Sequence, residues 1–191
     1  MWWKALLAAF GLMFVAELGD KTQIVILTLS AKCGFRQVFL GAAAAFALLN
    51  VLAVSIGVVL YRFLPEEVIK YAVSAIFVIA GIIMLLSSRE REGEEKEEVK
   101  VGLVDRRGPF LSAFLLVCLM ELGDKTQLSL LALSAKYSQP VFIFIGGTLA
   151  LWTTSLIGAL VGEGLGRVIP RLWVHIVSGL IFIAFGIINL F

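Results

Sequence analysis

Six apolar segments are the feature that most limits how this chain can fold. They cover approximately residues 5–30, 38–61, 68–87, 109–135, 140–162 and 170–191. Each is long enough to cross roughly 30 Å of hydrocarbon as a helix that rises about 1.5 Å per residue. They show no alternation of apolar and polar residues, and an α-helix satisfies its own backbone in lipid. The sequence therefore predicts an all-α integral membrane protein with six transmembrane helices.

Composition agrees with a protein whose surface contacts the lipid bilayer. Of the 191 residues, 60% are hydrophobic, and the mean hydropathy is +1.00. The net charge is only +2, and most charges lie between the third and fourth segments, so no basic face for nucleic acid is expected. The two cysteines and the single histidine lack the spacing of a zinc site.

The chain carries the same seven residues, ELGDKTQ, at Glu17–Gln23 and again at Glu121–Gln127. Further matches follow in the same order, such as FVIAGIIMLL at 77–86 and FIAFGIINLF at 182–191. The chain therefore reads as a duplicated three-helix unit, and an odd number of crossings inverts the second copy relative to the first. We expect a first repeat over 1–87, a charged loop over 88–108 and a second repeat over 109–191.

Basic residues near the ends of the segments predict the orientation. Four lie on one side: Lys4, Arg62, Lys70 and Lys136. Ten lie on the other: Lys32, Arg36, Arg89, Arg91, Lys96, Lys100, Arg106, Arg107, Arg167 and Arg171. Because basic residues concentrate in cytoplasmic loops, we expect the central loop in the cytoplasm and both termini outside it. In a prokaryote this would be the inner cell membrane.

The repeated motif places acidic residues in the middle of apolar segments, where each charge costs about 2.5–3.5 kcal/mol on insertion scales. On a continuous helix, Glu17, Asp20 and Gln23 would share one face as a stripe of oxygen ligands. Inverted repeats would bring the matching stripe of the second motif to the same depth. Hard oxygen donors favour calcium, manganese or magnesium over zinc or copper. The predicted cation site comprises Glu17, Asp20, Thr22, Gln23, Glu121, Asp124, Thr126 and Gln127.

Three other motif positions leave alternatives open. The glycine between the acids could loosen the helix locally or let another backbone approach. Each threonine could be a ligand or could bond to its own helix. Lys21 and Lys125 could pair with the glutamate four residues earlier, extend towards the membrane surface, or compete with the cation during transport.

Small and polar residues elsewhere are expected to serve helix packing. Close contact between helices would be permitted by Gly41, Gly57, Gly146, Gly147, Gly158 and Gly162. Asn50 could contact the site, but a hydrogen bond to a neighbouring helix is favoured.

Four acids exceed two lysines, so purely structural ion pairing leaves acids that need protons or a metal. Crowded carboxylates would release protons when a dication binds, which would couple the two. An acidic cation channel and an intramembrane aspartyl protease are the alternatives. Inverted repeats around a buried site favour a transporter with alternating access over both.

The paired E-x-G-D-[KR]-[TS] signatures, with a charged loop between them, resemble the Golgi-type manganese and calcium transporter family, whose bacterial relatives include manganese exporters. The resemblance covers nearly the whole chain. It implies antiport of manganese or calcium against protons, with Glu17, Asp20, Glu121 and Asp124 as the cation site. It implies no permanently bound cofactor and no enzymatic activity. Because six helices make a small bundle, a homodimer is an open alternative to a monomer.

Overall fold

The computed structural model describes residues 2–90, 108–137, 139–161 and 171–190. Regular structure in these ranges is helical throughout, which confirms the predicted all-α class there. The predicted central loop falls largely on residues outside these ranges. The helices are α1 (Trp2–Glu17), α2 (Lys21–Cys33), α3 (Phe35–Phe63), α4 (Glu66–Glu90), α6 (Pro109–Glu121), α7 (Lys125–Lys136), α8 (Pro140–Val161) and α9 (Arg171–Ile188).

Three of the described helices are long and apolar enough to cross a membrane unbroken. They span Phe35–Phe63 in α3, Glu66–Leu86 in α4 and Pro140–Ile157 in α8. Helices α1 and α2 meet the same criteria only as a pair, which is bent by 72° between them. Helix α6 and the Ile176–Ile188 part of α9 are apolar but shorter. The total of six crossings stays a prediction.

The sequence predicted one continuous helix over 5–30 and another over 109–135, and this is wrong. The first divides into α1 and α2, and the second into α6 and α7. Gly19 has a φ of 73° and Gly123 a φ of 83°, a left-handed conformation that interrupts an α-helix and that glycine adopts at little cost. The alternative that these glycines loosen the helix is therefore confirmed.

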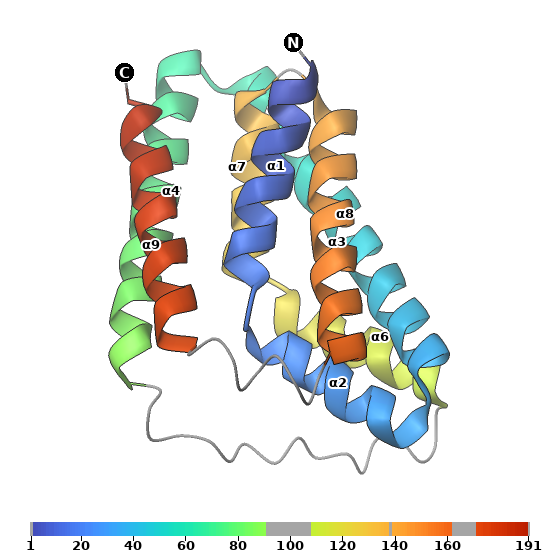
Figure 1. Cartoon of the computed structure of the whole chain (residues 1–191). Helices are drawn as coiled ribbons and strands as arrows, with labels where there is room; N and C mark the ends of the chain where they lie inside the picture. The colour runs from blue at the N-terminus through green and yellow to red at the C-terminus, as the bar shows by residue number, and fades with distance from the viewer. Residues whose placement is uncertain (1, 91–107, 138, 162–170, 191) are drawn as a thin grey trace.

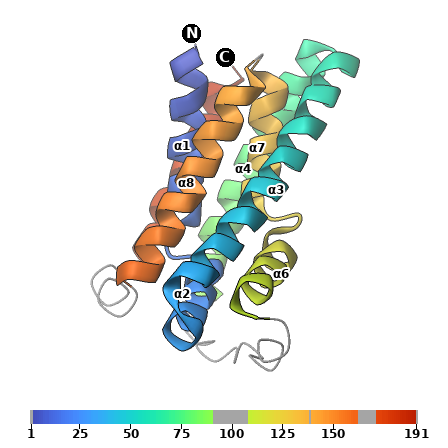
Figure 2. The ribbon, with the colours of Figure 1, turned by 90° about the vertical axis from the view of Figure 1, so that its right-hand side faces the viewer.

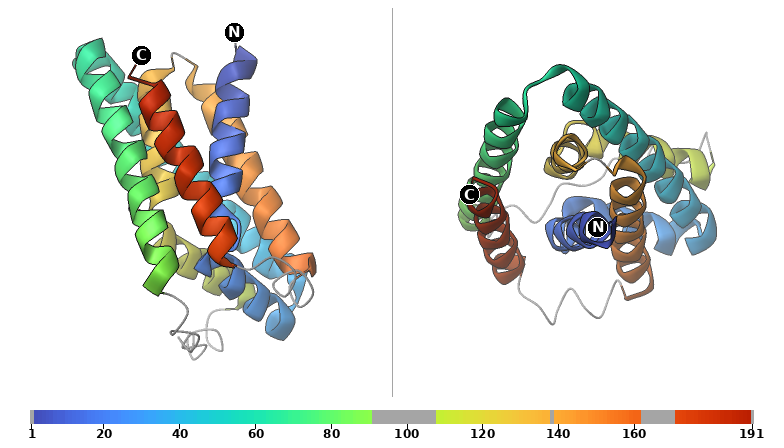
Figure 3. Two further views of the ribbon diagram at one scale, coloured as in Figure 1. Left: turned by 60° about the vertical axis from the view of Figure 1, so that its left-hand side comes forward. Right: turned by 90° about the horizontal axis from the view of Figure 1, so that it is seen from above.

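The helices form a bundle in which α1 and α7 lie inside (Figure 3). Helices α4 and α9 pack against each other as a pair on one side (Figure 1). On the other side, α8 packs on α1, and α3 packs on α6 and α7 (Figure 2). Helices α2 and α6 lie at the end of the bundle opposite the two chain ends (Figure 1). The two breaks lie at a similar height (Figures 1 and 2).

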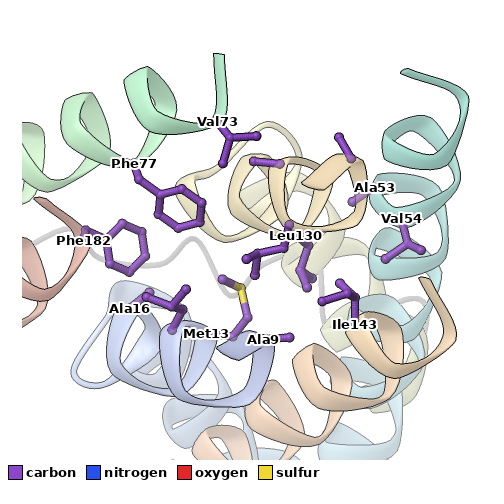
Figure 4. Close-up of a cluster of buried hydrophobic side chains, with 14 of the residues drawn as sticks. Ala9, Met13, Ala16, Ala53, Val54, Val73, Phe77, Leu130, Ile143 and Phe182 are labelled. Atoms are coloured by element: carbon purple, nitrogen blue, oxygen red, sulfur yellow. The ribbon is translucent and has the colours of Figure 1, made fainter. Parts of the chain in front are cut away.

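Two buried apolar clusters hold the broken helices in place. The first joins Met13 of α1 and Leu130 of α7 to Ile143 of α8 and to the rings of Phe77 and Phe182, whose centroids are 5.4 Å apart (Figure 4). The second joins side chains of α2, α3 and α6. Because α1 and α7 belong to the first cluster and α2 and α6 to the second, the breaks lie between the two clusters.

Close helix contacts confirm the predicted packing role of two glycines. A Cβ atom at Gly41 in α3 would lie 2.2 Å from the Phe110 carbonyl oxygen of α6. A Cβ at Gly146 in α8 would lie 2.4 Å from the Leu6 carbonyl oxygen of α1. Asn50 Nδ2 of α3 donates a hydrogen bond of 3.0 Å to Thr148 Oγ1 of α8, as expected of a contact between helices.

Candidate cation site

The two breaks give the four motif acids distinct positions in the backbone. Glu17 is the last residue of α1 and Glu121 the last residue of α6. Asp20 is the N-cap of α2 and Asp124 the N-cap of α7. The predicted single stripe along one helix is therefore wrong. Instead, each aspartate lies at the partially positive start of a helix, which stabilises a carboxylate.

Both motif glutamines stabilise the breaks. Gln23 Oε1 accepts a hydrogen bond of 3.1 Å from the Gly19 N–H, and Gln127 Oε1 accepts one of 2.6 Å from the Gly123 N–H. Each glutamine lies in the first turn of its helix and reaches back to an amide that precedes the helix, in the manner of a capping box. The sequence predicted these two glutamine oxygens as cation ligands, but in this structure they stabilise the backbone turn instead.

Threonines of both motifs meet at one glutamate. Thr22 Oγ1 of α2 donates a 2.6 Å hydrogen bond to Glu121 Oε1. Thr126 Oγ1 of α7 donates a 3.1 Å hydrogen bond to Glu121 Oε2. All three residues are buried. The contact from Thr22 joins two motifs that lie about a hundred residues apart in the sequence, so the breaks contribute to one site.

An ion pair also joins the two motifs. Lys125 Nζ pairs with Asp20 Oδ2, and it lies 3.2 Å from Asp124 Oδ2. The Lys125 side chain is 18% exposed, that of Asp20 12% and that of Asp124 34%. Of the alternatives left open for Lys125, pairing with the glutamate four residues earlier is not what the structure has, because the ammonium bridges the two aspartates instead. Lys21, its counterpart in the first motif, is exposed.

Glu17 stands apart from the other acids. It is 1% exposed, and neither carboxylate oxygen has a hydrogen-bond partner in the part of the chain that the structure describes. A buried carboxylate without a partner is costly as an anion, so this group needs a proton or a cation.

A cleft of about 470 Å³ opens beside the breaks. Its polar wall includes Asp20, Glu121, Asp124 and Lys125. Its apolar wall comes mainly from α4, with Ile76, Ile79, Ala80, Ile83 and Met84. No sequence pattern indicates this wall, because these residues look like any other part of an apolar span. The cleft gives the ion pair a route to the outside of the bundle.

The structure thus brings most of the predicted site residues into two groups. One contains Glu121 and its two threonines, and the other contains both aspartates around Lys125. Among the described residues, no three His, Cys, Asp or Glu side chains are gathered closely enough to hold a metal ion. A single site built from all four carboxylates stays a prediction.

A model of a protein family described as divalent cation/proton antiporter GDT1 matches residues 5–92 and 109–191. Over 199 residues the chain is 30% identical to GDT1-like protein sll0615 of Synechocystis, covering 97% of this chain and 96% of that protein. It is 29% identical over 207 residues to Protein PAM71, chloroplastic, of Arabidopsis thaliana, covering 95% of this chain and 55% of that protein.

A third relative, from Vibrio cholerae, is named "Putative manganese exporter". It is 31% identical over 154 residues, which cover 78% of this chain and 72% of the relative. No solved structure matches the chain. The matched family consists of transporters and not of enzymes. This confirms the predicted transporter function in place of the alternative, an intramembrane aspartyl protease. The chain belongs to the GDT1 family of divalent cation/proton antiporters.

Proposed function

We propose that this protein exchanges Mn²⁺ for protons across a membrane, with Ca²⁺ as a second substrate, at one site shared by its two motifs. The observation that carries the proposal is the hydrogen bond from Thr22 of the first motif to Glu121 of the second. It supports a site between the two broken helices, where charges from both halves act on the same ion.

The choice of substrate rests on the donor atoms and on the relatives. The motif side chains around the cleft offer carboxylate and hydroxyl oxygens, which suit Mn²⁺, Ca²⁺ and Mg²⁺. The name of the Vibrio cholerae relative specifies manganese, and this favours Mn²⁺ for the present chain.

Proton coupling follows from the surplus of negative charge. Four motif acids face one largely buried ammonium, that of Lys125, and Glu17 has no hydrogen-bonding partner among the described residues. When no dication is bound, the remaining negative charge is reduced by protons. A dication that binds the same carboxylates releases those protons, and protons that return to the carboxylates expel the dication.

Alternating access would use two inverted three-helix repeats. In this arrangement α6 would be the counterpart of α1, and α8 the counterpart of α3. Two packing relations support it, because α1 packs on α8 and α6 packs on α3. Helices α4 and α9, the last of each repeat, pack on each other. Rocking one set of helices against the other would expose the site to each side in turn. The uneven distribution of basic residues supports a cytoplasmic central loop.

Contact with lipid is proposed for the outer surfaces of α3 and α4. Large apolar side chains are exposed there, including Leu52, Ile56 and Val59 of α3 and Ile82 and Leu86 of α4. An exposed apolar surface of this kind suits a bilayer and not water.

Reconstitution into liposomes tests the function. A Mn²⁺ gradient should drive metal uptake together with an opposite movement of protons, measured by a metal-sensitive dye and a lumenal pH dye in the same sample. An imposed pH gradient should drive Mn²⁺ uphill. Metal flux that never moves against its gradient would indicate a channel and contradict the proposal.

A further inference from the structure

Resting on the proposed function, we propose that the ammonium of Lys125 is a tethered counter-cation of the site, which a dication displaces and a monovalent cation does not. Lys125 would thereby determine the specificity for divalent ions.

Geometry supports this role. Lys125 Nζ pairs with Asp20, which caps α2, and lies 3.2 Å from Asp124, which caps α7. It therefore holds together the starts of two helices from different halves of the chain. The same lysine and both aspartates line the cleft beside the breaks, so an ion arriving through that cleft meets this ion pair.

Charge explains the selectivity. The two aspartates carry two negative charges, and the lysine neutralises one of them. A dication in place of the ammonium neutralises both, so it gains more Coulomb energy than the ammonium loses. A Na⁺ or K⁺ ion would only replace one unit charge by another, so it neutralises no more of the two aspartates than the ammonium that is already tethered there. The lysine side chain is flexible enough to move aside.

The test compares Mn²⁺ binding to purified full-length protein in detergent, in buffers of equal ionic strength containing either NaCl or the chloride of a bulky organic cation. Lys125→Gln should bind Mn²⁺ roughly five- to tenfold more tightly in the organic salt, the scale of one partly buried ion pair. In NaCl its apparent affinity should fall by roughly fivefold or more, because Na⁺ now competes. The wild type should change less than about twofold between the two salts.

Two further variants separate specificity from structure. Lys125→Arg keeps the charge and should behave like the wild type. Lys4→Gln removes an exposed lysine at the start of α1, which does not line the cleft, and should keep the wild-type insensitivity to Na⁺. Weaker Mn²⁺ binding by Lys125→Gln in both salts, or continued insensitivity to Na⁺, would overturn the proposal. A wild type that binds neither Mn²⁺ nor Ca²⁺ would instead overturn the proposed function.

A measurement on the unmodified protein covers the case in which the variants do not fold. Amine-reactive labelling, read by mass spectrometry, should modify Lys125 faster when Mn²⁺ is present, because the displaced ammonium becomes accessible. Lys4, exposed near the start of α1, gives the internal reference rate. Slower or unchanged labelling of Lys125 with Mn²⁺ would show that the ion does not displace it.

Discussion

The first motif, Glu17–Gln23, and the second, Glu121–Gln127, share a backbone break but differ in their side-chain partners. In both, a glutamate ends one helix, a glycine with positive φ follows, and a glutamine caps the turn. In the second motif the glutamate accepts two threonine hydrogen bonds and the lysine bridges two aspartates. In the first, Glu17 is buried without a hydrogen-bond partner in the described chain, and the lysine is exposed.

This difference separates local from tertiary causes. The same seven residues produce the same turn, because its capping bonds lie within the motif. The partners of the acids and lysines come from other helices, so they depend on where each copy lies in the bundle. Unequal surroundings for two equal motifs are expected of a transporter in one of its two access states.

The largest expected effect is the loss of transport when either aspartate becomes an amide. Asp20→Asn and Asp124→Asn should each reduce coupled Mn²⁺ flux by roughly 100-fold, because each removes a negative charge that would bind the dication. The double variant should be little worse than either single variant, since members of one unit are not additive. The assay is metal and proton flux in liposomes.

Unequal results would sharpen the comparison between the motifs. If Asp20→Asn retained coupled flux while Asp124→Asn did not, only the second motif would carry the ion. The first would then serve helix packing. Insertion and folding are checked by gel filtration of each variant before the flux assay.

Alanine at either motif glycine tests the shared backbone break. Gly19→Ala and Gly123→Ala should each destabilise the protein by about 1–3 kcal/mol, since a side chain is strained at positive φ. A Cβ at Gly123 would meet nothing within 4 Å, so its cost comes from conformation and not from a clash. Thermal unfolding in detergent measures both.

A matched control is Gly11→Ala, in the middle of α1, where a Cβ also meets nothing within 4 Å. This variant should be neutral or more stable, because alanine favours helix more than glycine does. If Gly19→Ala and Gly123→Ala unfolded no earlier than the control, the two breaks would not depend on glycine.

The two glutamines should give smaller effects, and Gln23→Ala should cost more than Gln127→Ala because Gln23 Nε2 also donates a 3.3 Å hydrogen bond to the Thr154 carbonyl of α8. Gln23→Ala and Gln127→Ala each remove the acceptor of one glycine N–H, at a cost of about 1 kcal/mol. Replacement by glutamate keeps an acceptor and should restore much of the stability. A glutamine variant with normal stability but weakened Mn²⁺ binding would instead favour the predicted role as a ligand.

The smallest effect expected concerns the threonines. Thr22→Val should weaken Mn²⁺ binding by a few-fold and Thr126→Val by less, because the bond from Thr22 to Glu121 is shorter, 2.6 Å against 3.1 Å. Thr28→Val is the control, since that hydroxyl bonds only to the Ile24 carbonyl of its own helix among the contacts described. Equal effects for all three would argue against a special role at Glu121.

Sequence alone predicted the class of fold, and five of its eight predicted site residues lie in the two groups beside the breaks. Hydrophobic length predicted helices, and repetition of a charged motif within apolar segments pointed to the residues now found around the breaks. Close packing at Gly41 and Gly146 was also predictable, since small residues permit contact between helices.

The helix breaks and the different surroundings of the motifs were not predicted. Glycine within a helical pattern is compatible with an intact helix or a break, and only the positive φ at Gly19 and Gly123 distinguishes the two. Gln23 caps the turn only because the helix breaks there, so its capping role was not predicted either. The burial of Lys125 and exposure of Lys21 come from neighbouring helices, which two identical local sequences cannot encode.

The most direct test of one shared site is the number of Mn²⁺ ions bound per chain, measured by calorimetry on the wild type, Asp20→Asn and Asp124→Asn. A shared site predicts one ion per chain in the wild type and loss of that binding in both variants. Two ions per chain, with each variant keeping one at unchanged affinity, would contradict the shared site and show that each motif binds its own cation.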